Sequence, residues 1–71
     1  EKAEGYRRLV ALIRSMPEKY RRVLELRFVC EYSTKEIARE LGISPAAAEK
    51  RIQRGRTMLI EKLREEGYGD D

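Results

Sequence analysis

Apolar residues recur at helical spacing along most of this chain. Near its start, Tyr6, Leu9, Val10 and Ile13 follow an i, i+3, i+4, i+7 pattern, which predicts a helix over 3–15. A second apolar stripe predicts a helix over 17–30, with a break at 16–17. Proline suits the first position of that helix, where a missing N–H has no intrahelical partner to lose. The second stripe consists of Tyr20, Val23, Leu24 and Phe28.

The third predicted helix, over 34–41, is delimited by residues typical of helix ends. Ser33 and Glu36 have the spacing of a capping box, in which the serine hydroxyl accepts from the N–H three residues on and the acid reaches back. Gly42 directly follows the last apolar position and is expected in the left-handed conformation that ends a helix.

The fourth predicted helix, over 45–66, is the longest. Ser44 is expected to cap its start, and Pro45 suits its first position. We expect the residues after it, 67–71, to form a frayed tail. One face of this helix is apolar or small and carries Ala48, Ile52, Gly55, Leu59 and Leu63. A glycine inside a helix is unfavourable, so Gly55 indicates either close approach of another helix or a kink.

Because no strand pattern occurs, the fold class is all-α, with four helices in one domain spanning 1–71. A domain of 71 residues buries only ~60% of the surface that its unfolded chain exposes. Such a domain has no room for a deep pocket. The chain begins with Glu1 rather than Met, and we expect it to be a fragment of a longer protein.

The last two predicted helices and the residues between them have the layout of a helix-turn-helix. Gly42 allows a tight turn, and Ala38 keeps the first helix thin where the second must approach it. Ile37, Leu41 and Ile43 are expected to share a core with the last helix. An ordinary helical hairpin with a glycine turn is the alternative interpretation.

The face opposite the apolar stripe of the last helix carries candidate base-reading residues, and a further one, Glu49, lies on its flank. Lys50 and Arg54 lie one turn apart and suit the O6 and N7 acceptors of guanine. Glu49 can accept from a cytosine amine, Gln53 suits adenine, and Ala46 is small enough to touch a thymine methyl group. We expect recognition in the first turns of the helix, because that part enters the major groove.

Four further residues are candidates for phosphate contacts that fix the register on DNA: Thr34, Lys35, Arg51 and Arg56. The net formal charge is +3 and the isoelectric point is about 9.3, which favours an acidic partner such as nucleic acid. The alternative for a basic run of this kind is a solvated helix face.

Several classes of function are disfavoured by composition. The chain has no histidine, which removes the commonest general base and zinc ligand, so we expect no enzyme activity, metal or cofactor. The single cysteine, Cys30, fits a reducing cytosol and a cytoplasmic location. We expect its thiol to be buried or half-buried. No apolar run approaches the ~18 residues of a membrane span, and no signal-peptide pattern appears.

Three segments resemble region 4 of bacterial RNA polymerase sigma factors, especially those of the extracytoplasmic-function group. These are MPEKYRRVLELRF (16–28), YSTKEIARELGIS (32–44) and RIQRGR (51–56). The resemblance extends from about Leu12 to Leu63. A helix-turn-helix alone is shared by many regulators, whereas the proline-led helix at this distance before it is typical of sigma factors.

The resemblance implies recognition of the promoter −35 element in double-stranded DNA, with docking on the β flap of RNA polymerase core. It also implies an anti-sigma factor as a further partner, and we expect a monomer. Lys50 and Arg54 occupy positions where the family reads bases, and Arg51 occupies one where it grips phosphate. The chain departs from the family pattern at 46–48, which read Ala-Ala-Ala, and at Glu49, where a basic residue is common.

Two other functions remain open from the residues alone. One is the output domain of another helix-turn-helix regulator, which would dimerise through the last helix at Leu59 and Leu63. The other is a protein-interaction module that binds polymerase or an anti-sigma factor without reading DNA.

Overall fold

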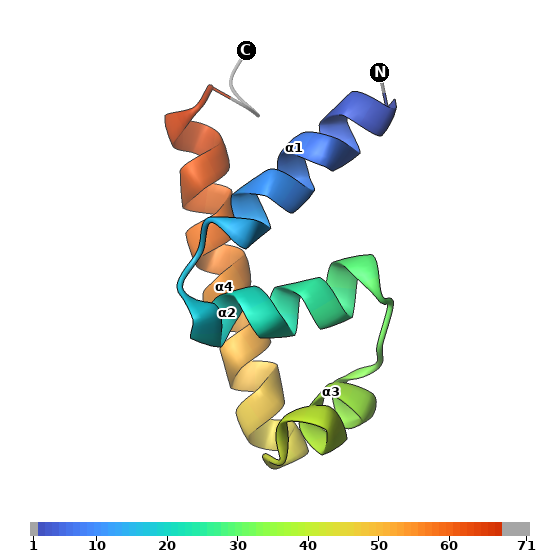
Figure 1. The fold of residues 1–71 in the computed structure, drawn as a ribbon. Coiled ribbons are helices and arrows are strands. Elements are labelled where there is room, and N and C mark those ends of the chain that lie inside the picture. The colour runs from blue at the N-terminus through green and yellow to red at the C-terminus, as the bar shows by residue number, and fades with distance from the viewer. Residues whose placement is uncertain (1, 68–71) are drawn as a thin grey trace.

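The computed structural model describes residues 2–67 and is all-α in this part of the chain, with no strand (Figure 1), as predicted. Gly67 forms part of a turn, and the rest of the predicted tail at 67–71 lies outside the described residues. In chain order the elements are α1 (Lys2–Arg14), α2 (Glu18–Leu24), the π-helix η1 (Glu25–Val29), α3 (Thr34–Leu41) and α4 (Pro45–Glu65).

The longest helix, α4, forms the axis on which the other helices pack. The molecule measures 38 × 21 × 18 Å, and α4 runs along its long dimension (Figure 1). α2 continues into η1 as one rod that crosses the middle of α4, and α3 crosses the N-terminal end of α4. α1 packs against the C-terminal half of α4. The N-terminal half of α4 is therefore held from two sides.

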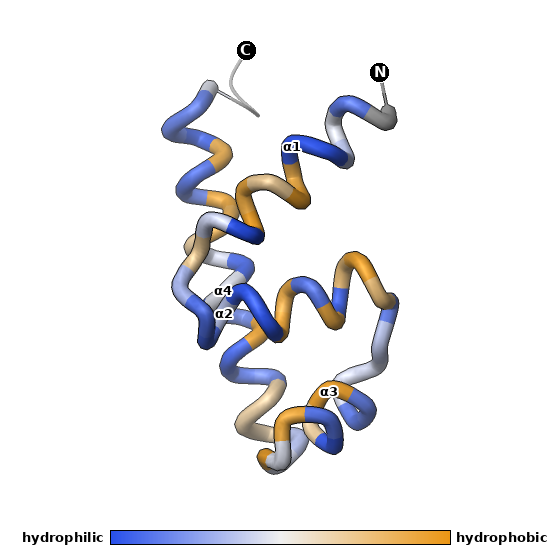
Figure 2. Tube along the Cα trace, viewed as in Figure 1, coloured by the Kyte–Doolittle hydropathy of each residue, from blue (hydrophilic) through white to orange (hydrophobic). Residues whose placement is uncertain are grey.

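Every helix contributes to one small core. Hydropathy alternates along each helix (Figure 2), so each presents an apolar stripe to its neighbours. No polar or charged side chain is buried among the described residues. The buried side chains are Ile13, Met16, Val23, Leu24, Ile37, Ala38, Ala48, Ile52 and Leu59.

Gly55 of α4 lies close to Leu24 of α2. A Cβ atom added there would lie 3.2 Å from Cγ and Cδ1 of Leu24, and Leu24 is fully buried. Close approach of another helix is thus the reason for the glycine, as one of the two sequence-based interpretations held.

The second helix differs from its prediction at both ends. Pro17 is the N-cap rather than the first helical residue: it is extended, with ψ of 145°, and its carbonyl accepts from Tyr20 and Arg21. After Leu24 the α-helical spacing gives way to π-helical spacing, in which the Cys30 N–H donates to the Glu25 carbonyl at 3.0 Å. The prediction of one α-helix over 17–30 is wrong there, because five residues form about one turn and show no period of their own.

The prediction for the cysteine is also wrong. Cys30 is exposed, since the rod ends at Val29 and the chain turns away through Glu31, which has a positive φ of 60°. No helix continues past this point to cover the thiol. Tyr6, part of the first predicted stripe, is 49% exposed, because the N-terminal part of α1 diverges from α4 (Figure 1).

Candidate nucleic-acid interface

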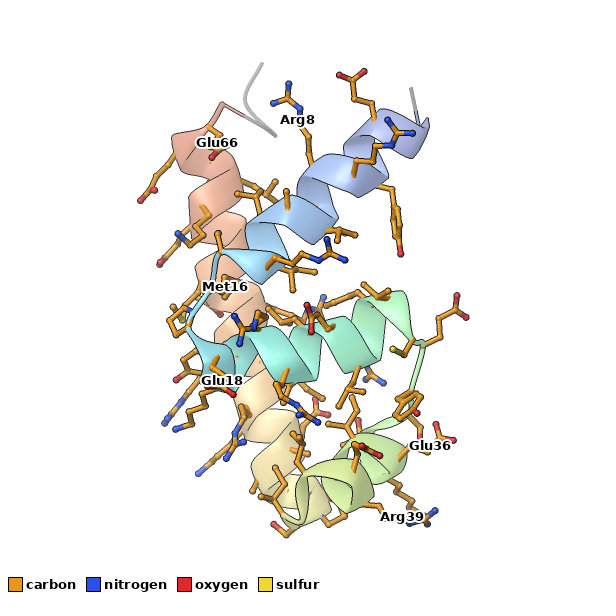
Figure 3. All side chains as sticks on the ribbon, in the orientation of Figure 1. Arg8, Met16, Glu18, Glu36, Arg39 and Glu66 are labelled. Carbon is orange, nitrogen blue, oxygen red and sulfur yellow. The ribbon has the colours of Figure 1, made fainter. Side chains whose placement is uncertain are left out.

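The start of α3 is fixed by the predicted capping box. The Ser33 N–H donates to Oε1 of Glu36 at 2.7 Å, and Oγ of Ser33 accepts from the Glu36 N–H at 3.1 Å. The Ser33 backbone N–H, together with the Ser33 side chain, holds the pKa of the Glu36 carboxyl below its ordinary value of 4.5. Glu36 and Arg39 both lie on the outer side of α3 (Figure 3).

A three-residue turn, 42–44, joins α3 to α4 as predicted. Gly42 has φ of 69° and ψ of 35°, the left-handed conformation, and the Ile43 N–H donates back to the Ala38 carbonyl at 3.0 Å. Oγ of Ser44 then accepts from the Ala47 N–H at 3.1 Å and caps α4. These bonds fix the angle at which α4 leaves α3.

The predicted base-reading residues share the outer face of α4, opposite its buried stripe. Ala46, Lys50, Gln53 and Arg54 are exposed, and Glu49 is half-buried. Their positions lie in the first half of the helix, the part held by α2 and α3. The structure therefore leaves four of these side chains accessible, and α2 and α3 pack against the same half of α4.

The structure also brings two residues of α2 to this face. Lys19 and Tyr20 line a shallow, open hollow together with Ala47 and three cationic residues of α4: Lys50, Arg51 and Arg54. Nζ of Lys19 lies 5.8 Å from the centroid of the Tyr20 ring, a cation–π distance. Sequence reasoning missed Lys19, because only the packing of α2 across α4 places it here.

The other predicted phosphate-binding residues lie outside this hollow. Arg56 lines a separate hollow with Gln53, Thr57 and Ile60, and Lys35 is exposed in the first turn of α3. Four cations thus line one hollow, and Arg56 and Lys35 lie apart from it.

Thr34 and Gln53 both donate hydrogen bonds to the Glu49 carboxylate. Oγ1 of Thr34 donates to Oε1 of Glu49 at 3.1 Å, and Nε2 of Gln53 donates to Oε2 of Glu49 at 3.2 Å. Arg27 of η1 adjoins them, since its Nη2 donates to Oγ1 of Thr34 at 3.4 Å. No pattern in the sequence indicates Arg27, because it lies in the π-helix η1, which was not predicted.

A capped helix, a tight left-handed turn and a second helix with a cationic outer face define a helix-turn-helix DNA-binding domain. A family model described as "Sigma-70, region 4" matches residues 6–59. The chain belongs to this family, whose members are non-enzymatic. It is a sigma-factor domain with a DNA-binding role in transcription.

The chain is also similar to a curated relative, "RNA polymerase sigma factor SigZ" of Bacillus subtilis (strain 168). The two are 47% identical over 51 residues, which cover 72% of this chain and 29% of the relative. The chain thus spans less than a third of that relative's length. No solved structure matches the chain significantly. None of the helices within residues 2–67 has the length and hydropathy to cross a membrane.

Proposed function

We propose that this domain recognises a promoter −35 element in the major groove as region 4 of an RNA polymerase sigma factor. The observation that supports this most strongly is the hollow in which Lys19 meets Lys50, Arg51 and Arg54. Cations from two helices converge beside the exposed first half of α4, where a recognition helix contacts base edges.

In this proposal the base contacts come from the outer face of α4. Lys50 and Arg54 donate to guanine, and Gln53 pairs with adenine through its amide. Glu49 retains free lone pairs on both oxygens, because each carboxylate oxygen has two and accepts one bond. These acceptors suit a cytosine amine, and Ala46 suits a thymine methyl group.

Phosphate contacts fix the register of the same complex. Arg51, Arg56 and Lys35 supply charged side chains, and Lys19 adds one from α2. The hydroxyl proton of Thr34 is donated to Glu49, so the hydroxyl cannot also donate to a phosphate. The phosphate contact proposed for Thr34 is therefore made by its backbone N–H, which at the first position of α3 has no intrahelical acceptor.

The test compares Arg54→Ala with Arg51→Ala on duplexes selected from a randomised pool by the parent domain. Arg54→Ala should relax the preference at one base pair, at a cost of ~1–3 kcal/mol for a bidentate guanine contact. Arg51→Ala should weaken binding to all sequences alike, because a phosphate contact carries no base information. Fluorescence anisotropy on duplexes that differ at single base pairs measures both.

The exposed Arg64, near the C-terminal end of α4, supplies the control Arg64→Ala. Its affinity for every duplex should match that of the parent. If Arg54→Ala and Arg51→Ala also bind selected and random duplexes as the parent does, the proposed contacts are wrong.

We propose that the domain binds RNA polymerase core through its β flap, and that an anti-sigma factor is a further partner. We also propose that the domain is a monomer in solution. The relative's description as an RNA polymerase sigma factor supports the first of these. Leu59 is only 5% exposed and Leu63 is half-buried, so neither offers a free surface for dimerisation, which supports a monomer. Sedimentation equilibrium of the domain, alone and with the isolated flap, tests both expectations, and a self-associating domain without flap binding contradicts them.

A further inference from the structure

A chain of hydrogen bonds connects the π-helix to the outer face of α4. It begins at Arg27, whose Nη1 donates to the Tyr32 carbonyl at 3.2 Å and whose Nη2 donates to Oγ1 of Thr34 at 3.4 Å. It continues from Oγ1 of Thr34 to Oε1 of Glu49 at 3.1 Å, and Nε2 of Gln53 completes it at Oε2 of Glu49, 3.2 Å away. Thr34 of α3 and Gln53 of α4 thus both donate to the Glu49 carboxylate, and Arg27 of η1 joins the chain through Thr34.

The donor and acceptor chemistry of this chain sets the direction of every bond. A threonine hydroxyl has one proton, and here that proton goes to Glu49, while Arg27 donates to the same oxygen. A hydroxyl that accepts from a cation is polarised and becomes a better donor. Arg27, Thr34 and Glu49 are all half-buried, so water competes less for the bonds among these three residues than on an open helix face, whereas the bond from Gln53 to Glu49 is exposed.

The consequence at Gln53 is a defined amide orientation. A free glutamine amide can exchange its oxygen and nitrogen by rotation, and so presents two donor–acceptor patterns. With Nε2 bonded to Glu49, Gln53 presents its remaining N–H and its Oε1 in one order. A donor beside an acceptor matches the N7 and N6 amine of adenine.

We propose that Arg27 and Thr34 are positioning residues for base recognition, which act by holding Glu49 and Gln53 in one arrangement. This inference rests on the proposed function of the domain. Neither side chain needs to touch DNA for this role, because Glu49 and Gln53 make the base contacts. The base preference at the pairs that face Glu49 and Gln53 therefore depends on a guanidinium in η1 and a hydroxyl in α3.

The principal test replaces Thr34 by Val, which keeps the shape and removes the hydroxyl, and by Ser, which keeps the hydroxyl. For Thr34→Val we expect the preference for adenine over the other bases to fall by about tenfold at the position that Gln53 faces, the size of a typical lost base contact. Preferences at positions that face neither Glu49 nor Gln53, and the salt dependence of binding, should stay as in the parent. Thr34→Ser should restore the adenine preference.

Arg27→Gln is a second variant, and it should also lower the preference for adenine at the position that Gln53 faces. Its matched control is Arg22→Gln, because Arg22 is an exposed arginine of α2. Thermal unfolding of each variant separates positioning from loss of fold, since a destabilised domain loses affinity for all duplexes equally.

A DNA-free measurement gives the inference its own readout. Gln53 is the only glutamine in the chain, and the chain has no asparagine, so the side-chain amide gives a single pair of proton NMR signals. In the parent we expect these two signals to be well separated, and in Thr34→Val we expect them to move towards the positions of a free amide. Thr34→Ser should show the parental signals.

The outcomes distinguish the inference from the function on which it rests. A parent domain that binds all duplexes equally contradicts the proposed function. A selective parent whose preferences survive unchanged in Thr34→Val and Arg27→Gln overturns the inference alone. Identical Gln53 amide signals in the parent and Thr34→Val overturn it as well.

Discussion

Lys19 illustrates how much a single side chain depends on its neighbours for its role. It lies in α2, and on its own helix it is an exposed lysine beside Tyr20. The crossing of α2 over α4 brings it to the hollow shared with Lys50 and Arg54. In the proposed complex, a cation in this position neutralises a phosphate and releases bound counterions.

We predict that Lys19→Ala weakens binding to selected and random duplexes by the same factor. The slope of log affinity against log salt concentration should decrease in magnitude by ~0.9, the value for one lost phosphate contact on duplex DNA. Anisotropy titrations at several salt concentrations measure this slope, with Arg64→Ala as the charge-matched control. An unchanged slope would place Lys19 outside the interface.

At the scale of elements, α3 is the shorter of the two helices of the helix-turn-helix, and its stability depends on the bonds at its ends. Its capping box joins Ser33 and Glu36 through two bonds, and Gly42 closes its other end. The capping box is sensitive to pH, because the bond from the Ser33 N–H favours the ionised form of Glu36 and lowers its pKa.

The direction of the pH dependence follows from that lowered pKa. A carboxyl with a pKa lower in the folded than in the unfolded state stabilises the fold above its ordinary pKa of 4.5. This stabilisation is lost as the pH falls through the folded value. We predict that Glu36→Gln lowers the free energy of unfolding at neutral pH, and that the difference from the parent shrinks as the pH falls below 4.5.

Urea denaturation at neutral and acidic pH measures this difference. Glu40→Gln is the control, since Glu40 is an exposed acid of α3 and lies outside the capping box. A difference between parent and Glu36→Gln that is the same at both pH values would contradict the role assigned to the carboxylate.

The element that periodicity could not reveal is η1. Its five residues, Glu25–Val29, extend a rod that already has an apolar stripe, so the sequence favoured a single α-helix. The change of spacing matters for the site, because Arg27 lies within η1 and reaches both Tyr32 and Thr34. Local widening of a helix is often found at functional positions.

At the scale of the whole molecule, the crossing of α2 and α4 determines the shape of the interface. We predict that Gly55→Ala lowers the free energy of unfolding by about 1 kcal/mol, because overpacking against Leu24 costs roughly 1–3 kcal/mol and better helix propensity offsets about 1 kcal/mol. Leu24 is fully buried and has little room to move. Denaturant titration measures the change.

Gly5→Ala is a matched control, since Gly5 lies in α1 with nothing within 4 Å of an added Cβ. The same substitution should stabilise the domain there, by up to ~1 kcal/mol. The double variant Leu24→Val/Gly55→Ala should be less destabilised than the sum of its single variants, because the smaller side chain relieves the contact. Equal effects of the two glycine substitutions would contradict the packing argument.

The sequence by itself determined the helices with strong local signals. Ser33, Glu36, Gly42 and Ser44 fix their own segments through bonds to neighbours within a few positions, so α3 and the start of α4 were predicted to the residue. The outer face of α4 followed from its buried stripe, because helical periodicity is a local property.

Only the tertiary structure decided which side chains from different helices meet. The place of Lys19 beside α4, the bond between Thr34 and Glu49, and the contact of Leu24 with Gly55 all depend on crossing angles. The exposure of Cys30 likewise depends on where the rod ends. Crossing angles arise from the packing of many side chains at once, which the pattern of one helix does not contain.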